Sequence, residues 1–412
     1  MEQPAGEGGD WDRVRIWEVE RCWGSITTIP DYLSAFIRFI QLKSLRKRTE
    51  EEDVRWVTRL ARHCGVACPS LLGEEEVHQC GDCQRQTYVY HSCNHRACPK
   101  CGGREQKEWA AAQEAKLLRA SYFMATFTLP AELRPFAYRQ QRWFYDLMFR
   151  AMALTLNDFA QDTRHLGGTP GFSAVLHTWT REMQYHPHLH VILPGLALSA
   201  DGLRVRRAKG KRYLFPVKAL GAAFRHRVRR LLEVLDREEK TWHLAALDGV
   251  VWRKPWVVDV RAVGRGQAAV RYLARYVHKT AVSEPRLLGY DAGGNIRLNC
   301  QDSKTGRWHS VTLSVEEFLR RWCLHVLPKG LVRVRHYGFL SPAAKQKFAR
   351  LHQILGTQPA AKPPPLEPAK PKCPCCGQEM TLLLVIPRPP RWMGPSRAPP
   401  IHSTCAAAST TG

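Results

Sequence analysis

Two short patterns in this sequence combine side chains that can hold a metal ion with side chains that can attack a phosphate. His188 and His190 stand two positions apart in QYHPHLHVILPG, with Leu189 between them. Alternate side chains of a β-strand share one face, so both imidazoles can bind one divalent cation while Leu189 points into the core. Surface histidines also reach this spacing by chance, so the pair alone is a weak indication of a metal site.

The second pattern is VRYLARYVHKT, in which Tyr272 and Tyr276 are four positions apart. On a helix this spacing places one ring above the other on a single face. A buried stripe shared with Val270 and Leu273 is the alternative interpretation. The cations around the pair are Arg271, Arg275, His278 and Lys279. Such cations would hold a DNA phosphate and favour the phenolate, which is the nucleophilic form of tyrosine.

Cysteines at zinc-ligand spacing precede both patterns. Cys80 and Cys83 form one CxxC, and Cys98 and Cys101 form another. Two such pairs can place four thiolates tetrahedrally around one zinc ion. Because all four ligands are protein groups, the sequence predicts a closed, structural zinc site rather than a catalytic one. Two other nearby residues could substitute for a ligand or complete the shell, namely Cys93 and His95.

A second group of cysteines lies near the end of the sequence. Cys373, Cys375 and Cys376 occur in CPCCG, and His402 and Cys405 follow downstream. This group could form another half of a zinc ribbon, although the segment between its parts is rich in proline and irregular in spacing. For the first group, four unrelated buried thiols are the alternative.

The charge balance of the chain points to a polyanionic partner. Among 412 residues there are 62 Lys and Arg against 37 Asp and Glu, giving a formal net charge of +25. A field of this sign favours nucleic acid, although a ribosomal-type protein or one bound to a membrane surface would share it. The polar first residues indicate no signal peptide, and no apolar run approaches the roughly 18 residues that span a bilayer. We therefore expect a soluble, intracellular protein whose cysteines include metal ligands.

Alternating strand and helix signals over residues 106–340 must position these side chains. The predicted strands cover 121–129, 171–183, 188–193, 256–263 and 332–337, with a hairpin over 296–300 and 308–313 around KTGR. The predicted helices cover 135–158, 217–237, 267–280 and 316–326. Hairpins mixed with helices predict an α+β fold with a central antiparallel sheet flanked by helices.

Three further regions complete the predicted organisation. Residues 1–78 are expected to form a small helical region that could bind DNA, and residues 79–105 form the zinc ribbon. Residues 106–340 are the expected catalytic domain. Residues 341–412 are rich in Pro, Ala and Lys and are expected to be a flexible tail that carries the second cysteine group.

The combination of these motifs resembles the HUH superfamily of single-strand nicking enzymes, and most closely the two-tyrosine transposases of rolling-circle insertion sequences. Four stretches carry the resemblance, which runs from about Cys80 to Leu340: YHSCNHRACPKC, HPHLHVILPG, VRYLARYVHKTAVSEPRLL and EEFLRRWCLHVLPKGLVRVRHYGFLS. The chain departs from the family at Ala97, where a histidine usually precedes the third zinc-ligand cysteine. Residues 1–78 also match the family poorly.

The resemblance implies a bacterial transposase of the cytoplasm and nucleoid that acts on single-stranded DNA at the ends of its element and at the target. His188 and His190 would hold Mg²⁺ or Mn²⁺, with Glu182 or Gln184 as the third ligand. One of the two tyrosines would attack the scissile phosphate and form a 5′-phosphotyrosine bond, and the other would permit a second cleavage. The oligomeric state stays open.

Basic residues elsewhere are candidates for contacts to the DNA backbone. Besides Arg271, Arg275 and Lys279, they include Arg333 and Arg335, the segment Arg204 to Arg212, and Arg225, Arg227, Arg229 and Arg230 on a predicted helix. A solvated basic face is the alternative for these clusters. The tryptophans that could stack on bases, or lie in the core, are Trp143, Trp179, Trp242 and Trp256.

Two other functions share part of this evidence. A plasmid or phage replication initiator would use the same chemistry at one replication origin. A non-catalytic zinc-ribbon protein would bind DNA without needing Tyr272 or Tyr276. The VRVRHYGFL segment and the upstream cysteines favour the transposase.

Overall fold

The computed structural model describes residues 75–90, 102–239, 249–278, 281–302, 305–361, 363–366 and 370–386. The chain divides into two compact units, of which the first takes in Ser92–Pro368 and the second joins Val57–His91 to Ala369–Gly412. Most of the predicted helical region 1–78 lies outside the described residues. Its last part differs from the prediction, because Glu75–Cys80 is a β-strand, β1.

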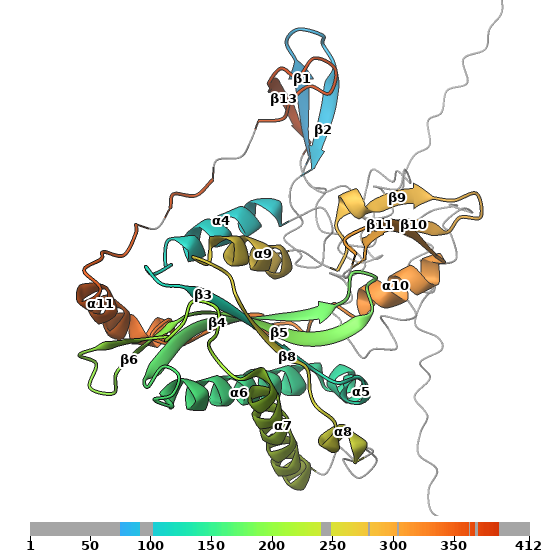
Figure 1. Cartoon of the computed structure of the whole chain (residues 1–412). Helices are drawn as coiled ribbons and strands as arrows, with labels where there is room; N and C mark the ends of the chain where they lie inside the picture. Colours follow the sequence, from blue (N-terminus) through green and yellow to red (C-terminus); the bar gives the residue numbers. More distant parts are fainter. Residues whose placement is uncertain are drawn as a thin grey trace, which may run out of the picture. The chain divides into compact units, whose positions relative to one another are not determined.

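A seven-stranded antiparallel sheet is the framework of the first unit (Figure 1). Its order is β7 (Val205–Arg207), β6 (Leu196–Leu198), β4 (Thr169–Trp179), β5 (Tyr185–Pro194), β3 (Tyr122–Thr128) and β8 (Val258–Ala262), and β12 (Val334–Gly338) also pairs with β4. All of these pairings are antiparallel. The predicted mixture of helices with an antiparallel sheet is confirmed.

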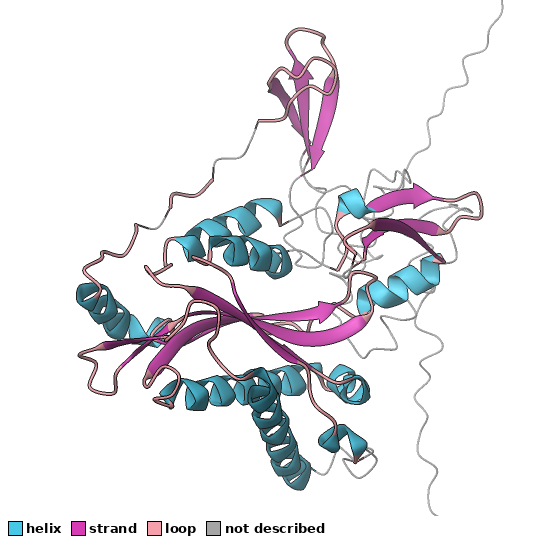
Figure 2. Cartoon of the chain, in the orientation of Figure 1, coloured by secondary structure: helices cyan, strands magenta, loops and turns pink. Residues whose placement is uncertain are grey.

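One face of the sheet carries the main hydrophobic core. Phe123, Ala125 and Phe127 alternate along β3 and are fully buried. They pack with residues of the long helices in one hydrophobic cluster. The helices on this face are α5 (Arg134–Arg139), α6 (Gln141–Gln161), α7 (Val217–Glu239) and α8 (Val250–Arg253), as Figure 2 shows. The strict alternation explains why β3 turns its other side chains to the opposite face.

The opposite face of the sheet is covered by α4 (Gly103–Glu114), α9 (Gln267–His278) and α11 (Lys345–Ile354). Val175 and Ile192 of the sheet join Val270 and Leu273 of α9 in a second hydrophobic cluster. The apolar side of α9 therefore faces the sheet. The histidine motif of β5 lies on this same face.

The hairpin of β4 and β5 determines which side chains stand beside one another. His177 pairs with His188, and Val175 pairs with His190. Directly opposite residues of an antiparallel pair point to the same face. The register of this hairpin therefore brings a third histidine beside the predicted pair.

A small lobe follows α9 in the chain. Its three-stranded antiparallel sheet has the order β11 (Trp308–Leu313), β10 (Ile296–Gln301) and β9 (Leu287–Tyr290), with α10 (Val315–Cys323) next. The predicted hairpin around KTGR is confirmed by the pairing of β10 with β11. The Ser314 side chain accepts a hydrogen bond from the Glu317 backbone N–H and caps the start of α10.

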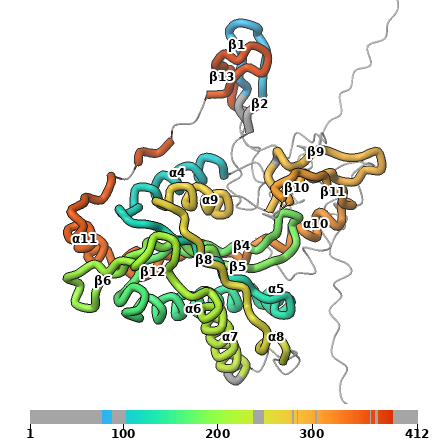
Figure 3. The backbone as a smooth tube through the Cα atoms, viewed as in Figure 1, coloured from blue at the N-terminus to red at the C-terminus, as the bar shows by residue number. Residues whose placement is uncertain are grey.

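Strand β12 returns to the main sheet from far along the chain and pairs with β4 (Figure 3). The glycines of this pairing allow the close approach. A Cβ on Gly171 would lie 2.4 Å from the ring of Phe339, and one on Gly338 would lie 1.7 Å from the Pro170 carbonyl oxygen. Gly338 also has a φ of +58°, a conformation that strains other residues. These contacts explain why β12 ends in a glycine and is followed by Phe339.

The second unit is a three-stranded antiparallel sheet of order β13 (Met380–Ile386), β1 and β2 (Gln86–Tyr90). The expectation that residues 341–412 form a flexible tail needs correction, because α11 and β13 both lie within that range. Leu351 of α11 is buried against the sheet, which explains why this helix is ordered. Among the residues described, no helix is both long and apolar enough to cross a membrane.

Candidate active site

Three histidines meet on the face of the sheet that α9 covers. His188 and His190 lie on β5, and His177 lies opposite on β4. His177 Nδ1 is 2.8 Å from His188 Nε2, and His188 Nε2 is 3.1 Å from His190 Nε2. One nitrogen of each ring thus lies within 4.8 Å of the others, in an arrangement that could hold a metal ion.

Hydrogen bonds on the far side of the rings orient two of these histidines. His188 Nδ1 lies 2.7 Å from the backbone oxygen of His186, and His190 Nδ1 lies 3.1 Å from Thr126 Oγ1. A carbonyl oxygen only accepts, so His188 carries its proton on Nδ1 and turns the lone pair of Nε2 toward the other rings. Metal-binding histidines are commonly held in this way by a partner on the outer nitrogen.

Burial keeps these imidazoles neutral. It lowers the pKa of His177 and His188 well below the usual value, with a further contribution from the neighbouring histidines. It lowers the pKa of His190 to about 4, with help from the charge of Arg261. A neutral imidazole is the form that binds metal. The donor set and its protonation therefore fit a divalent ion.

Both predicted tyrosines of α9 face the histidines. The Tyr276 ring centroid lies 4.2 Å from that of His177 and 5.9 Å from that of His190. The Tyr272 ring lies 5.8 Å from His190, and the two tyrosine rings are 4.9 Å apart. The spacing of four residues therefore puts both tyrosines on one face of the helix, as predicted, and this face lies over the histidine cluster.

Tyr276 is partly buried, with its ring against His177. Burial raises its pKa above the usual value, and the neighbouring Tyr272 raises it further. The charges of Arg181 and Arg275 act in the opposite direction and favour the phenolate. Arg275 is exposed and could meet a phosphate that approaches this end of the site.

Arg333 was predicted to contact DNA, but it lies buried inside the protein. Its side chain is only 8% exposed, and Nη1 donates to the backbone oxygens of Tyr276 and Val277, at 2.8 and 3.1 Å. The guanidinium therefore satisfies carbonyls at the carboxy-terminal end of α9, where a positive charge also interacts favourably with the negative end of the helix dipole. Arg333 positions the helix that carries both tyrosines.

Two of the other predicted DNA contacts, Arg271 and Arg335, already have carboxylate partners within the protein. Arg271 is exposed but pairs with Glu114 of α4 at 2.7 Å. Arg335 forms an ion pair with Asp146 and lies 4.1 Å above the Phe149 ring, on the face away from the histidines. Lys279 lies outside the described residues.

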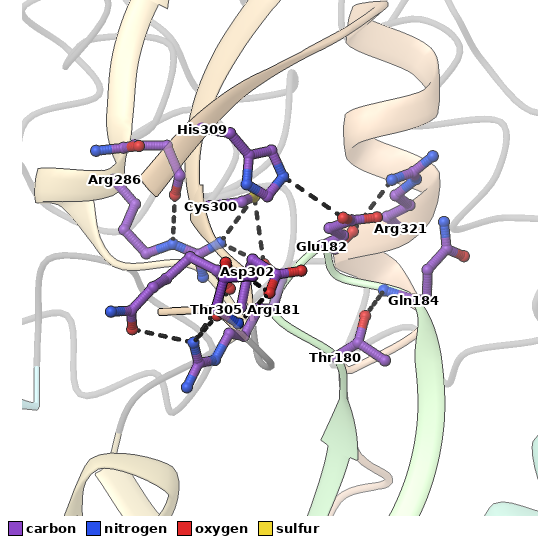
Figure 4. A network of polar contacts seen from close by, with 12 residues as sticks. Thr180, Arg181, Glu182, Gln184, Arg286, Cys300, Asp302, Thr305, His309 and Arg321 are labelled. Carbon is purple, nitrogen blue, oxygen red and sulfur yellow. Dashed lines mark hydrogen bonds and ion pairs between the residues drawn. The ribbon is translucent and has the colours of Figure 1, made fainter. Parts of the chain in front are cut away.

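Glu182 and Gln184, the predicted third metal ligands, lie in the turn of the β4–β5 hairpin (Figure 4). Glu182 Oε1 is 3.6 Å from His309 Nε2, and the Gln184 backbone N–H donates to Thr180 Oγ1 at 3.1 Å. The turn thus contacts the small lobe, whereas His177 occupies the place beside His188. The group of side chains that could hold a metal ion consists of His177, His188 and His190, and neither Glu182 nor Gln184 belongs to it.

The small lobe also holds the turn through arginines. Arg181 Nη1 donates to the backbone oxygens of Gln301 and Asp302, at 3.1 and 3.0 Å, and Arg286 donates to the backbone oxygen of Arg181 (Figure 4). The same figure shows Arg321 beside the turn, where it donates to the Glu182 backbone oxygen at 3.1 Å. These bonds fix the end of the hairpin that carries His177 and His188.

The cysteines form a set that differs from the one predicted. Cys80 and Cys83 lie beside Cys373 and Cys376, and the four sulfur atoms are within 4.8 Å of one another. Cys98, Cys101, Cys93 and His95 lie outside the described residues, as do His402 and Cys405. The predicted grouping with Cys98 and Cys101 thus falls partly outside the described residues, and within them Cys80 and Cys83 lie beside Cys373 and Cys376.

Most arginines of the basic helix α7 already have partners within the protein. Arg227 pairs with Asp158, Arg229 and Arg230 pair with Glu233, and Arg225 donates to the backbone oxygen of Lys254 at 2.6 Å. Arg204, at the start of the other cluster, pairs with Asp201. Of the tryptophans, Trp179 and Trp256 are buried, Trp143 is 49% exposed, and Trp242 is not described.

The sequence of this chain matches two protein families and two named relatives. Residues 171–347 match the family described as "Putative transposase", and residues 41–129 match the one described as "Transposase zinc-binding domain". The chain is similar to "Putative transposase y4qJ" of Sinorhizobium fredii, with 34% identity over 75% of this chain and 84% of that protein. It is also similar to the transposase for insertion sequence element IS801 of Pseudomonas savastanoi pv. phaseolicola, with 27% identity over 70% of each chain.

No solved structure matches the chain. The two families and the two relatives nevertheless agree on one kind of protein. The histidine and tyrosine motifs both lie within residues 171–347, which match the putative transposase family. The chain belongs to the family of insertion-sequence transposases that includes IS91 and IS801.

Proposed function

We propose that this transposase cuts and rejoins single strands of DNA at the ends of its element, through a covalent tyrosine–DNA intermediate made in an HUH nuclease domain. The observation that supports this proposal is the position of Tyr272 and Tyr276 over His177, His188 and His190. Rolling-circle transposition, to which the family is linked, needs a reaction of this kind.

The reaction exchanges one phosphate ester for another. The hydroxyl oxygen of one tyrosine attacks the scissile phosphorus, and the bond from phosphorus to the 3′ oxygen breaks. The tyrosine gives up its proton to solvent, the leaving 3′ oxygen takes up a proton, and a 5′-phosphotyrosine remains. Attack by a 3′-hydroxyl on this ester reverses the exchange, so rejoining needs no ATP.

The two tyrosines allow two cleavages in sequence. Their rings are in contact, and both lie beside His190, at 5.8 Å for Tyr272 and 5.9 Å for Tyr276. One tyrosine can therefore carry a DNA end while the other remains near the same histidines. This arrangement suits the transfer of a strand from a donor to a target.

Arg181 and Arg275 make the buried hydroxyl of Tyr276 a better nucleophile. Burial alone would hold Tyr276 protonated, and their charges act against this effect. A DNA phosphate bound by the exposed Arg275 would lie at the same end of the helix. Arg333 has a positioning role, since it holds the carbonyls at the end of α9.

His177, His188 and His190 are the residues that would hold the catalytic Mg²⁺ or Mn²⁺. When bound, such an ion withdraws charge from the scissile phosphate and stabilises the transition state. The three donors are all imidazole nitrogens, which favour transition-metal ions over Mg²⁺. We therefore expect Mn²⁺ to support activity at a lower concentration than Mg²⁺.

The test is a cleavage assay on single-stranded oligonucleotides taken from the ends of the encoding element, with Mn²⁺ or Mg²⁺. We expect a metal-dependent covalent protein–DNA band on a denaturing gel. The band should disappear in the double variant Tyr272→Phe with Tyr276→Phe, and the single variants should show the order of attack. Tyr213→Phe, at a tyrosine that is 60% exposed, is the matched control and should keep the band.

Other outcomes of this assay would redirect the proposal. A double variant that still forms the band would exclude these tyrosines as nucleophiles. Tight DNA binding with no band under either metal would favour a non-catalytic DNA-binding protein. Cleavage at a single origin sequence, with no activity on paired element ends, would favour a replication initiator.

A further inference from the structure

The two CxxC turns of the second unit have the same backbone hydrogen bonds. The first cysteine of each turn donates to a carbonyl five residues on, Cys80 to Arg85 at 2.9 Å and Cys373 to Gln378 at 2.8 Å. It accepts from the N–H four residues on, Gln84 to Cys80 at 3.1 Å and Gly377 to Cys373 at 2.9 Å. Two equivalent turns that face each other are the usual framework of a zinc ribbon.

The residue after the second cysteine is left-handed in both turns. Gln84 has a φ of 57° and Gly377 a φ of 77°. Glycine adopts this conformation without strain, whereas glutamine does so at some cost. Gln84 and Met183 are the non-glycine residues with positive φ in the described part of the chain. Because this conformation is strained at Gln84, interactions beyond the turn's own residues must hold the turn in place.

The strands that carry the turns are paired with each other. Cys80, the last residue of β1, pairs with Met380, the first residue of β13. Cys80, Cys373 and Met380 form a small buried cluster of their own. The positions of the turns are therefore set by a sheet that joins residues 75–90 to residues 370–386.

The sulfur atoms of the two turns face one another at metal-site distances. Cys80 Sγ is 3.4 Å from Cys376 Sγ, and Cys83 Sγ is 3.4 Å from Cys373 Sγ. Sulfurs of a disulfide are about 2 Å apart. Four sulfurs bound to one tetrahedral zinc at about 2.3 Å lie roughly 3.8 Å apart. The observed separation is near the second value.

We propose that Cys80, Cys83, Cys373 and Cys376 bind one structural zinc ion, so that the ribbon begins in the amino-terminal part of the chain and is completed by its carboxy-terminal part. Cys373 and Cys376 lie outside both stretches that match the transposase families, 41–129 and 171–347. The proposal is independent of the cleavage chemistry, because it concerns the second unit alone.

Cys375 provides a control within the same CPCC sequence. Its sulfur accepts a hydrogen bond from Arg85 Nη1 at 3.3 Å and is not among the four clustered sulfurs. Cys375 is exposed, so its replacement by serine should be tolerated. The double variant Cys373→Ser with Cys376→Ser should therefore lose zinc. The single variant Cys375→Ser changes the same short segment and should keep it.

The first test measures zinc in the purified full-length chain by mass spectrometry of the metal, and cobalt–thiolate absorption after exchange with Co²⁺. The double variant Cys373→Ser with Cys376→Ser should lose about one zinc per chain relative to wild type, and Cys375→Ser should lose none. A double variant that keeps the zinc content and the cobalt spectrum of wild type would overturn the proposal.

A second measurement avoids variants that fail to fold. The wild-type protein is stripped of zinc with a chelator, oxidised briefly under native conditions and digested, and its disulfide-linked peptides are identified. Links that join Cys80 or Cys83 to Cys373 or Cys376 are expected from the 3.4 Å sulfur separations. Links from Cys80 and Cys83 only to Cys98 and Cys101 would show that the zinc belongs to the amino-terminal cysteines and would overturn the proposal.

Discussion

Replacing His177 tests whether the third histidine is a metal ligand. His177→Ala removes one of three nitrogen donors, the one that lies 2.8 Å from His188 Nε2. Changes to groups that only support a metal ligand commonly weaken metal binding about 10- to 100-fold. Loss of a ligand itself should cost at least that much, which corresponds to about 1.4 to 2.8 kcal/mol in binding free energy.

The control for this variant is Val175→Ala, two residues earlier on the same strand. Val175 is fully buried, shares the face of His177 and pairs with His190, but it offers no donor atom. Both changes truncate a buried side chain to its Cβ, so both should lower the free energy of unfolding by roughly 1 to 3 kcal/mol. Only His177→Ala should raise the metal concentration that DNA cleavage requires.

The assay is DNA cleavage as a function of Mn²⁺ concentration, combined with calorimetric titration of Mn²⁺ into the free protein. We expect the Mn²⁺ concentration that gives half-maximal cleavage to be at least about tenfold higher for His177→Ala than for Val175→Ala. High Mn²⁺ should partly restore the cleavage rate of His177→Ala. Equal midpoints for the two variants would refute the assignment of His177 as a ligand. They would leave His177 as a packing residue beneath Tyr276.

Three other perturbations have outcomes that follow from the structure. Gly338→Ala should lower the free energy of unfolding in urea by roughly 3 kcal/mol or more, because the new Cβ would meet the Pro170 carbonyl oxygen at 1.7 Å. The control is Gly202→Ala, at a left-handed glycine in open space, which should lower it by only about 1 kcal/mol. Equal costs would contradict the close contact. In metal-free protein, stability should fall as the pH drops from 6.5 toward 4, because the unfolded chain takes up a proton that folded His190, with its pKa lowered to about 4, does not. A thermal midpoint that does not change between about pH 7 and 5 would be inconsistent with this linkage. Affinity for single-stranded DNA, measured by filter binding, should fall by roughly 300-fold or more between about 50 and 200 mM salt if six or more phosphates are neutralised. A flat response would show that the net charge of +25 does not drive binding.

Local patterns in the sequence predicted much of the framework of the site. Alternation around His188 and His190 indicated a strand, and the four-residue spacing of Tyr272 and Tyr276 indicated a helix face. Both are short-range properties, in which the type of element follows from residues that are neighbours in the chain. The helices α7 and α9 and the hairpin of β10 and β11 were predictable for the same reason.

His177 was not predicted because its role depends on strand register. It lies on a segment that was expected to be a strand, but a shift of one residue would turn it to the opposite face. The turn between β4 and β5 sets the register that brings it opposite His188. The signal that could have found it was a histidine on the strand just before the HxH strand, provided that the length of the turn was known.

The cysteine grouping and the position of Arg333 depend on contacts between distant parts of the chain. Cys83 and Cys373 are 290 positions apart, and the sequence offers a nearer CxxC that is chemically just as suitable. Arg333 alternates with apolar residues in a basic strand, which suits a surface contact as well as a buried one. Only the three-dimensional pairing of β12 with β4 shows that Arg333 reaches the end of α9.

Because β1 pairs with β13, the second unit cannot form until nearly all of the chain has been synthesised. Cys80 and Cys83 leave the ribosome first, and the 290 positions that separate Cys83 from Cys373 take roughly 15 to 60 seconds to translate at about 5 to 20 residues per second. Every strand of the main sheet, from β3 to β12, is translated during that time, while Cys80 and Cys83 still have no partners from the carboxy-terminal segment. A transposase that terminates before Cys373 would carry the tyrosines and histidines without the two thiols that lie beside Cys80 and Cys83.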